Sequence, residues 1–392
     1  MKDKVVLINQ TSGYLMVDTV NAFADKYKEV VFIYGTLGHD ERPLNSKVKV
    51  DRIIKYNRNS ALRRILTWGV GTMQIFWKLL TKYRGYHVVY VTNPPMSYLC
   101  ANLLKNTFSV IVYDIYPDAL RNVGIKEGHP IYNWWAKQNR KLFAMAEKVY
   151  SLSDSMATAL SVYVPKDKVM IIPLWPSSEK FAPIPKAQNE FAVSHGLQDK
   201  FVVMYSGNMG YTHSVDVLVD VAAKMKDNEK VHFLLVGGGQ KKPIIEERVE
   251  KENLLNCTIL DWQPIEVLPQ SLATADLAVV TLNEESAKVS VPSKTFNMMA
   301  VGAPLMFISP CESEMHRLIG KYDNGACFTP ADVDGMKAFI ERLAADAQYR
   351  SKLSTNSLNA SKDFTVENAK VYVEDNLNPD LNPNLNINED GK

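Results

Sequence analysis

Short apolar runs alternate with helix-length segments along most of the chain. In the first half, apolar runs begin at residues 5, 30, 88, 110, 148 and 168. Continuous runs of β-branched and aliphatic residues, without polar alternation, are typical of strands buried on both faces of a parallel sheet. The helical segments between them fit crossover connections, so the first half is predicted to form a doubly wound α/β domain.

The same pattern restarts near residue 200. Its apolar runs begin at residues 201, 231, 257, 277, 304 and 326, again with helical segments between them. The stretch 174–190 separates the two series, and its three prolines and weak periodicity are typical of a linker. We therefore expect an N-terminal Rossmann-like domain over 1–175, a linker over 176–189 and a C-terminal Rossmann-like domain over 190–362.

The residues after the second domain are of two kinds. Residues 363–376 are predicted to form a helix that can return to the N-terminal domain. Residues 377–392 are rich in asparagine, include two prolines and offer little apolar surface to bury. This last segment is therefore predicted to be disordered.

Charge and cysteine content narrow the possible functions. The chain has 45 Lys and Arg against 43 Asp and Glu, a net charge of +2 that argues against a nucleic-acid-binding protein. Its four cysteines are widely spaced without a C-x-x-C pair, which predicts a reducing compartment and neither disulfides nor a metal site. The N-terminus enters a strand-like run without a signal-peptide core, and no apolar stretch is long enough to span a bilayer, so we expect a cytoplasmic protein.

Three features of the second half are suited to binding phosphate. The loop from Gly207 to Gly210 joins a strand to a helix, where backbone N–H groups approach an anion, although such turns also occur without a ligand. Gly237 and Gly238 either permit a second close approach or form a plain turn. Ser293 is placed to cap the next helix. Lys294 opposes that helix's dipole unless it meets a phosphate, the alternative being a solvated surface side chain.

In the first half, candidate chemistry lies where strands end, because open parallel sheets bind ligands at the carboxyl ends of their strands. One such end carries TNPPMSYL, from Thr92, and the next carries YDIYPDALR, from Tyr113. Asp114 is placed to act as a base, to orient a sugar hydroxyl or only to close a turn. Asp118 either faces the same edge or caps the short helix after Pro117.

The uncharged segment from Ile65 to Trp77 has two interpretations. It is either a buried helix packed on the sheet or an amphipathic helix lying in a membrane surface. Cations at positions 63, 64, 78, 82 and 84 flank it and suit anionic lipid. The second interpretation predicts docking through Arg63, Arg64, Trp68, Phe76, Trp77 and Lys78.

Five motifs occur in one order: TNPPMSYLCANLL, VYDIYPDAL, YSGNMGYTHSVDVLVDVA, FLLVGGG and VPSKTFNMMAVGAPL. Together they resemble the family 4 glycosyltransferases of the GT-B fold, in the branch of O-antigen, capsule and colanic-acid synthesis. The resemblance covers residues 1 to about 375. It implies two Rossmann-like domains facing a cleft. The implied reaction is sugar transfer from a UDP- or GDP-sugar to a lipid-linked saccharide, with retention of configuration and with neither metal nor other cofactor.

The resemblance also implies roles for individual residues. Lys294 would offset charge on the leaving nucleotide, and Asp114 would be the second catalytic residue, on the acceptor side. The donor phosphates would be bound by Gly207, Asn208, Gly210, Ser293 and Lys294. Expected nucleoside contacts are Gly237, Gly238, Trp262 and Gln263, and expected sugar contacts are His213, Glu284, Glu285 and Asn297. Expected acceptor contacts are Asn93, Pro94 and Asp118.

A lipid-linked acceptor is confined to the bilayer. The resemblance therefore favours the docking interpretation and a peripheral position on the inner face of the cytoplasmic membrane.

The chain departs from the family pattern at positions that usually carry charge. Asn208 and His213 replace an Arg and a Lys, and Val289 and Asn297 replace two glutamates. Two alternatives to an active transferase therefore remain: a nucleotide-sugar epimerase of the GT-B type, and an inactive glycan-binding or partner subunit. The scattered histidines argue against the epimerase, and the retained Ser293 and Lys294 argue against the inactive subunit.

Overall fold

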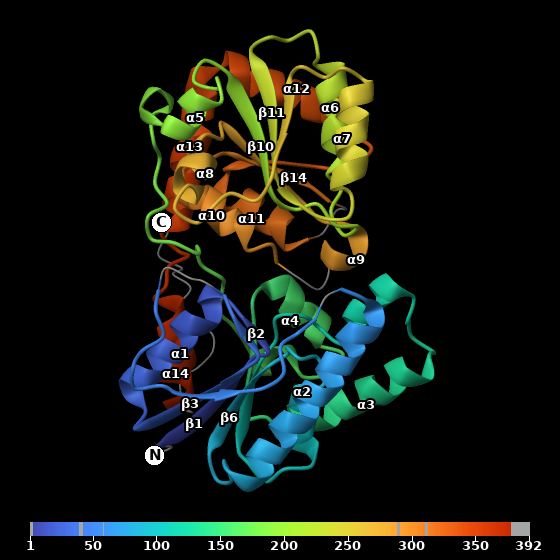
Figure 1. Ribbon diagram of the computed structural model, residues 1–392, viewed down its shortest axis with the longest axis vertical. Helices are drawn as coiled ribbons and strands as arrows, with labels where there is room; N and C mark the ends of the chain where they lie inside the picture. The colour runs from blue at the N-terminus through green and yellow to red at the C-terminus, as the bar shows by residue number, and fades with distance from the viewer. Residues whose placement is uncertain (1–2, 39–41, 58, 288–290, 310–312, 378–392) are drawn as a thin grey trace. The chain divides into compact units, whose positions relative to one another are not determined.

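The computed structural model describes residues 3–38, 42–57, 59–287, 291–309 and 313–377. The chain divides into two compact units, which Figure 1 shows. Unit 1 comprises residues 1–177 and 366–392, and unit 2 comprises residues 178–365. The predicted disordered tail falls, from residue 378 onward, outside the described residues.

Unit 1 is built on a parallel sheet of seven strands in the order β5-β3-β1-β6-β7-β8-β9. In chain order the strands are β1 (Lys4–Ile8), β3 (Glu29–Tyr34), β5 (Lys49–Arg52), β6 (His87–Val91), β7 (Phe108–Ile111), β8 (Lys148–Ser151) and β9 (Val169–Ile171). Two short strands, β2 (Thr11–Ser12) and β4 (Thr36–Leu37), pair beyond the ends of β1 and β3. The order reverses between β1 and β6, so both neighbouring loops meet at that edge.

Helices cover both faces of this sheet, which explains why β1 and β6 are almost entirely apolar. The helices are α1 (Tyr14–Lys26), α2 (Ala61–Thr81), α3 (Pro130–Met145), α4 (Asp154–Leu160) and α14 (Asn368–Leu377). Three short 3-10 helices are η1 (Ser97–Asn102), η2 (Asp118–Val123) and η3 (Lys166–Lys168). Figure 1 shows α14, in red, beside α1, in blue, although they come from opposite ends of the chain.

A buried polar cluster holds α14 on unit 1. The carboxylate of Asp375 accepts hydrogen bonds from Lys148 Nζ, at 2.7 Å, and from the Tyr150 hydroxyl, at 2.9 Å. Asn376 donates to the Tyr150 hydroxyl, at 2.7 Å, and accepts from the Ser109 hydroxyl, at 2.7 Å. The helix expected over 363–376 is therefore α14, and its last turn is tied to the ends of the unit 1 strands.

Unit 2 repeats the plan with a six-stranded parallel sheet in the order β12-β11-β10-β13-β14-β15. The strands are β10 (Phe201–Asn208), β11 (Val231–Gly238), β12 (Cys257–Leu260), β13 (Leu277–Thr281), β14 (Leu305–Ile308) and β15 (Gly325–Phe328). The helices are η4 (Lys186–Gln188), α5 (Glu190–Ser194), α6 (Asp216–Lys224), α7 (Lys242–Lys251), α8 (Leu268–Ala273), α9 (Glu284–Ala287), α10 (Lys294–Ala300), α11 (Glu314–Tyr322), α12 (Val333–Ala345) and α13 (Ala347–Ser361).

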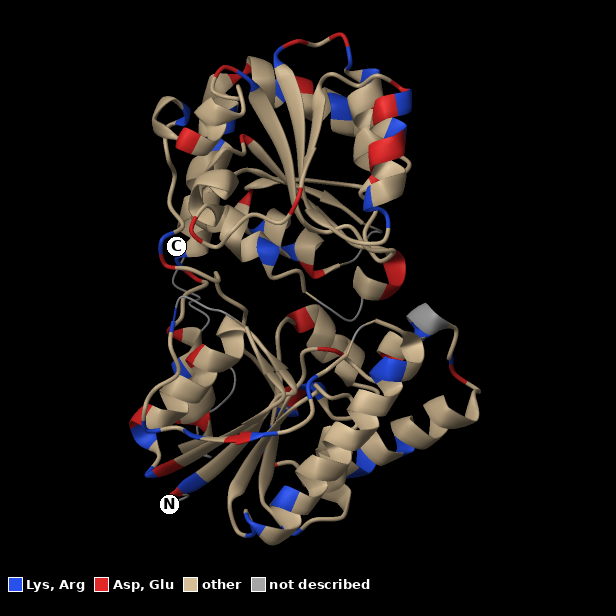
Figure 2. Cartoon of the chain, in the orientation of Figure 1, with Lys and Arg blue, Asp and Glu red and all other residues tan. Residues whose placement is uncertain are grey.

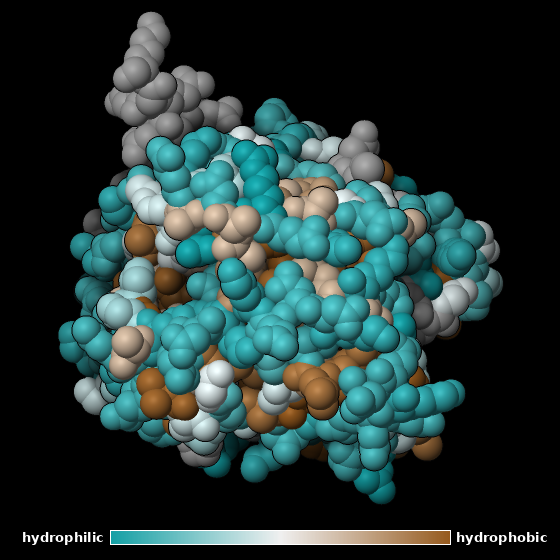
Figure 3. Space-filling model, turned by 90° about the horizontal axis from the view of Figure 1, so that it is seen from above, coloured by the Kyte–Doolittle hydropathy of each residue, from teal (hydrophilic) through white to brown (hydrophobic). Residues whose placement is uncertain are grey.

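The core of unit 2 lies between the sheet and its helices. One face of β10, β11 and β13 packs against α6, α7 and α12 through side chains such as Val203, Leu235, Val219 and Ile340. Helix α10 contacts β13 and β14, so the sheet is covered on both sides. Hydrophilic residues dominate the surface seen in Figure 3, with apolar residues between them in small groups.

The two doubly wound sheets confirm the predicted fold class. Every strand expected from an apolar run is present. The strand β5 was not expected, because its sequence KVDR lacks the apolar run of its neighbours and it lies at the sheet edge. Residues 178–189 of the expected linker group with unit 2, where Lys186 forms an ion pair with Asp276.

Candidate functional site

The loop after β10 is fixed by its neighbour after β11. A Cβ atom on Gly237 would lie 2.0 Å from the carbonyl oxygen of Gly207, so only glycine fits there. The Met209 amide donates to Gly238 O at 2.7 Å, and the Lys241 amide donates to Met209 O at 2.9 Å. The two glycine-containing turns therefore hold one another in place.

This loop forms one wall of a cavity of about 370 Å³ within unit 2. The volume falls within the usual range for a small-molecule site. Its polar lining comes from Ser206, Gly207, Asn208, His213, Gln263, Ser293, Lys294 and Asn297. Its apolar and aromatic lining comes from Val236, Trp262, Leu268, Leu272, Pro292 and Met298.

Lys294 supplies the unusual chemistry of this cavity. Its Nζ is buried and has no hydrogen-bond partner within the described ranges. The nitrogen lies 3.8 Å from the centre of the Tyr205 ring, and a Cβ atom on Gly207 would lie 3.2 Å from it. Burial lowers the pKa of Lys294 from an ordinary value of 10.5 to about 7. The solvated-lysine alternative is therefore wrong, and the ammonium lacks the counter-ion that would stabilise its charge.

Ser293 lines the cavity but does not cap the helix as expected. Its backbone already has right-handed helical angles, φ −59° and ψ −27°, and its hydroxyl forms no capping hydrogen bond with α10. An N-cap residue needs extended backbone angles to turn its oxygen toward the first helical amides. The Ser293 hydroxyl is therefore available to the cavity.

His213 is held in one tautomer beside Lys294. Its Nδ1 lies 2.7 Å from the carbonyl oxygen of Thr281, so Nδ1 carries the hydrogen and Nε2 is an acceptor. Burial, followed by the nearby charge of Lys294, lowers the pKa of His213 to about 4. The residue is thus neutral at physiological pH and lines the cavity without adding charge.

Several residues predicted to bind the sugar donor do not line the cavity. Gly210, Gly237, Gly238, Glu284 and Glu285 are absent from its lining. Gly237 and Gly238 lie behind residues that line the cavity. A Cβ atom on Gly238, for example, would lie 2.8 Å from the Trp262 indole nitrogen. Gly210 is buried, and its carbonyl accepts from the His213 amide at 3.0 Å. Val289 lies outside the described residues.

In unit 1 the end of β7 carries Asp114. The Thr92 hydroxyl accepts from the amides of Tyr113 and Asp114, each at 3.1 Å, and so fixes this turn to the end of β6. The Asp114 side chain is exposed, while the surrounding protein weakens hydration of the carboxylate and raises its pKa to about 6. This position suits a group that binds or takes up a proton.

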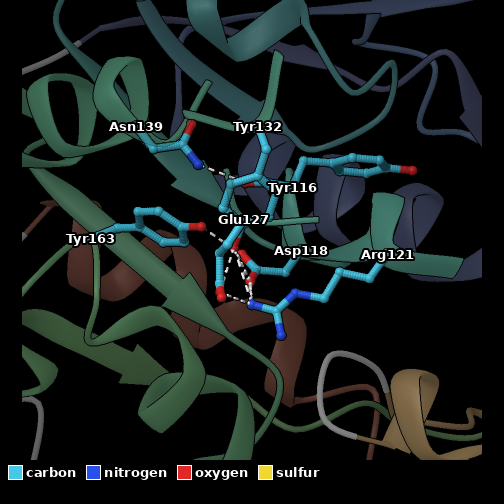
Figure 4. A network of polar contacts seen from close by, with 7 residues as sticks. All are labelled: Tyr116, Asp118, Arg121, Glu127, Tyr132, Asn139 and Tyr163. Carbon is cyan, nitrogen blue, oxygen red and sulfur yellow. Dashed lines mark hydrogen bonds and ion pairs between the residues drawn. The ribbon is translucent and has the colours of Figure 1, made fainter. Parts of the chain in front are cut away.

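Asp118 has a structural role other than the predicted helix cap. Figure 4 shows its carboxylate at the centre of a polar network of η2, α3 and the loop before η3. One oxygen accepts from Tyr132, at 2.7 Å, and Arg121, at 2.9 Å, and the other accepts from Tyr163, at 2.5 Å. Both carboxylate oxygens of Asp118 already accept hydrogen bonds, so Asp118 organises the loop after β7. It is therefore not free to contact an acceptor substrate.

Tyr116 contributes its backbone to this region, and its side chain points away from the Asp118 cluster. Its carbonyl accepts from Asn139 at 2.6 Å, and its ring stacks on Trp135 with centroids 5.5 Å apart. Figure 4 shows the Tyr116 hydroxyl pointing away from the Asp118 cluster. The network therefore fixes the backbone while presenting this phenol elsewhere.

The other expected acceptor residues differ in accessibility. Asn93 is half-buried and donates from its side chain to Thr11 O at 3.4 Å. Pro94 is buried, and its carbonyl accepts from the Ser97 hydroxyl at 2.9 Å. Pro94 therefore shapes the turn after β6 and offers no contact surface, because its ring is covered.

Helix α2 contains the segment with two interpretations, and the buried-core interpretation is wrong. Only Gly71, Ile75 and Leu79 are buried along its length. Six of its large apolar residues form an exposed band, here called the apolar stripe: Leu62, Ile65, Leu66, Val70, Met73 and Trp77. Basic residues, blue in Figure 2, lie toward both ends of α2. No helix within the described residues is long and apolar enough to cross a membrane.

Of the three aromatic residues predicted to lie on the exposed face, only Trp77 does. Trp68 is half-buried and stacks on Tyr56 with centroids 5.6 Å apart, and Phe76 is also half-buried. Lys78 is paired with Asp51 and is not free to contact lipid. Among the predicted docking residues, Arg63 and Trp77 are exposed and Arg64 is half-buried.

Sequence reasoning missed several residues that shape these sites. Tyr205 lies two residues before Gly207, so strand alternation places both on the same face, which was the available signal. Thr281 acts at the end of β13 through its backbone carbonyl, which no side-chain motif marks. No group of three or more His, Cys, Asp or Glu in the described ranges is placed to hold a metal.

Comparison with solved structures identifies the fold class. The Anabaena Alr3699/HepE structure in complex with UDP and glucose aligns with a TM-score of 0.68 and 14% identity, covering 95% of this chain and 99% of that one. WaaG, a glycosyltransferase involved in lipopolysaccharide biosynthesis, aligns with a TM-score of 0.70 and 12% identity, covering 95% and 99%. The fold is that of the GT-B glycosyltransferases.

Sequence comparison then identifies the family of the second unit. Residues 200–346 match the family described as glycosyl transferases group 1. A probable glycosyltransferase from Pseudomonas aeruginosa, WbjE, is 22% identical over 86% of both chains. WcaI of Escherichia coli K12, a putative colanic acid biosynthesis glycosyl transferase, is 24% identical over 72% of both chains. The chain therefore carries a glycosyl transferases group 1 domain, and it is a glycosyltransferase.

Burial of the Lys294 ammonium predicts an effect on the stability of the protein. Lys294→Met should raise the free energy of unfolding near pH 7, because it removes an unpaired charge from an apolar position. The advantage should shrink as pH rises above 7, by about 1 kcal/mol per unit. The sign follows from the lowered pKa: above pH 7 the unfolded lysine retains a proton that the folded one has lost. Urea denaturation at pH 7, 8 and 9 measures both effects, and a difference that is independent of pH contradicts the burial of this charge.

Proposed function

We propose that the chain transfers a sugar from a nucleotide-sugar donor, a UDP- or GDP-sugar, to a lipid-linked saccharide in surface-polysaccharide synthesis. Transfer occurs with retention of anomeric configuration and without a metal ion. The names of the relatives support the pathway class, and the UDP and glucose in the HepE complex support the donor class. Retention and metal independence rest on the family resemblance alone.

The buried Nζ of Lys294 is the observation that carries the donor proposal. An unpaired ammonium in a cavity of this volume favours an anionic ligand, because a phosphate supplies the missing counter-ion. Gly207 leaves room beside that nitrogen, and Ser293 offers on the same wall a hydroxyl that does not cap α10. We infer that the donor diphosphate lies against these three residues.

The same group then assists the reaction. As the sugar leaves, negative charge accumulates on the departing nucleotide diphosphate. The Lys294 ammonium, held in place before the reaction, stabilises that charge without reorganisation of solvent. The neutral His213 accepts a hydrogen bond from a donor hydroxyl through Nε2. Asp114, with its raised pKa, orients the acceptor hydroxyl or takes its proton.

Turnover provides the test of the donor site. Lys294→Met should lower kcat about 100-fold to 1,000-fold, the usual cost of losing one such stabilising group. The matched control is Lys337→Met in the same unit, which removes a surface lysine paired with Glu341 at 3.7 Å and should leave kcat within about twofold. Release of UDP or GDP is measured with a panel of nucleotide-sugars and a membrane lipid extract, in EDTA.

The outcomes of this assay separate the alternatives. Wild-type turnover by Lys294→Met contradicts the phosphate assignment. Activity lost in EDTA and restored by Mn²⁺ contradicts metal independence. Isomerised donor without nucleotide release indicates an epimerase, and donor binding without any conversion indicates an inactive subunit.

The proposed acceptor places the enzyme on the inner face of the cytoplasmic membrane. The apolar stripe supports this position, because its residues recur at helical spacing and the chain has no acidic residue between positions 60 and 85. An exposed apolar band beside cations suits the boundary between acyl chains and anionic headgroups. We propose that α2 docks on anionic lipid through this stripe.

Polar substitutions on the stripe test docking. Leu66→Gln combined with Met73→Gln should weaken binding to phosphatidylglycerol vesicles at least tenfold, because both side chains are more than half exposed and available for insertion. The control is Leu103→Gln, which changes a residue of unit 1 that is 76% exposed but lies off the stripe. Vesicle co-sedimentation measures binding, and docking is refuted when the double variant and the control bind equally well.

A further inference from the structure

Tyr205 contacts three of the polar residues that line the cavity of unit 2, although it does not line the cavity itself. It lies in β10, near the middle of the sheet, and is fully buried. The centroid of its ring lies 3.8 Å from Lys294 Nζ. Its hydroxyl donates to Asn208 O at 2.6 Å, and its ring meets the His213 ring in a T-shaped arrangement with centroids 6.4 Å apart. One buried side chain therefore connects the ammonium, the glycine loop and the neutral imidazole.

The partner of the buried ammonium is a ring, and this choice has a chemical consequence. The face of a tyrosine ring attracts a cation within roughly 6 Å, although the ring carries no net charge. A carboxylate in the same place would neutralise the ammonium, and an anionic ligand would then meet no net charge. None of the described residues that line the cavity carries a carboxylate. The ring therefore holds the ammonium in place and leaves its charge available to an anion.

The same tyrosine fixes the backbone that borders the ammonium. A Cβ atom on Gly207 would lie 3.2 Å from Lys294 Nζ and 3.4 Å from its Cδ atom, so this part of the loop adjoins the lysine side chain. The Tyr205 hydroxyl binds the carbonyl of the next residue, Asn208. Burial raises the pKa of Tyr205, so the phenol keeps its proton and remains a hydrogen-bond donor. Ring and hydroxyl thus hold two neighbouring parts of the cavity wall through one rigid side chain.

We propose that Tyr205 is a positioning residue for the donor site. Its ring face holds the Lys294 ammonium without neutralising it, and its hydroxyl fixes the loop after β10 at Asn208. This inference rests on the proposed function, in which Lys294 and the loop meet the donor diphosphate. It adds the residue that keeps both in position before the donor binds.

Fluorination of the ring tests its contact with the ammonium. Tyr205→Phe is compared with proteins that carry, at the same position, phenylalanines with one, two and three ring fluorines. Fluorine withdraws electrons from the ring face with little change in shape, so the charged form of Lys294 loses stabilisation. The pKa of Lys294, measured without nucleotide from the ¹³Cε signals of labelled lysine, should fall stepwise by about one unit in all.

The matched control places the same fluorinated series at Phe233. This ring is fully buried in the neighbouring strand β11, where its register partner is Val203. Fluorine there should leave the pKa of Lys294 unchanged. A pKa of Lys294 that does not change along the series at Tyr205, or that changes equally along the series at Phe233, would overturn the role of the ring.

Tyr205→Phe without fluorine tests the hydroxyl. This variant keeps the ring face and loses the hydrogen bond to Asn208 O, so the pKa of Lys294 should stay at the wild-type value. Its affinity for UDP or GDP, whichever the wild type binds, should fall about threefold to tenfold, the effect of losing one hydrogen bond. Calorimetry measures this affinity. Equal affinities of Tyr205→Phe and the wild type would overturn the role of the hydroxyl.

Failure of the proposed function gives a different pattern from failure of this inference. If the wild-type protein binds neither UDP nor GDP, the donor proposal fails, whereas the fluorinated series, measured without nucleotide, still judges the contact between Tyr205 and Lys294. If nucleotide binds normally and fluorine at position 205 leaves the pKa of Lys294 unchanged, only the positioning role is refuted.

Discussion

An ammonium group kept away from water, with no counter-ion among the described residues, is the constraint on which the cavity of unit 2 depends. Lys294 meets the face of Tyr205, and Gly207 leaves the space into which its charge is directed. Burial and the nearby charge of Lys294 keep the neighbouring His213 neutral, so a second cation does not compete for the same anion. The hydrogen bonds between the loop after β10 and the turn after β11 hold these groups in position before a ligand binds. Such an arrangement lowers stability and is retained where a bound anion restores the balance.

In unit 1, networks of hydrogen bonds fix the loop that carries Asp114. Thr92 and Asp118 use their oxygen atoms to fix the loop after β7, which leaves Asp114 accessible and directs Tyr116 away from the network. Helix α2 is held against this edge by Gly71, where a Cβ atom would lie 2.7 Å from the Gln10 side chain. The helix can therefore leave the apolar stripe exposed on its outer positions, because its attachment depends on a few buried residues.

The sequence predicted the fold because buried parallel strands must be continuously apolar. It also identified Lys294 as a candidate phosphate ligand, because a lysine at the start of a helix opposes the helix dipole unless it meets an anion. It did not reveal that Ser293 adopts helical angles, that both oxygens of Asp118 are already used or that Pro94 is covered, because these depend on atoms brought together by tertiary packing. For the same reason, Trp68 and Phe76 of α2 were assigned to the exposed face, although both are half-buried. Helical periodicity alone gives the angle between two residues and does not say which one meets the sheet.

The most direct measurement is the pKa of Lys294 with and without nucleotide, from the ¹³Cε signals of labelled lysine assigned with Lys294→Arg. In the free protein the value should lie at about 7. With UDP or GDP bound it should rise toward the ordinary lysine value of 10.5, because the diphosphate stabilises the charged form. A free value near that of an exposed lysine, or one that bound nucleotide leaves unchanged, would contradict the account of this site.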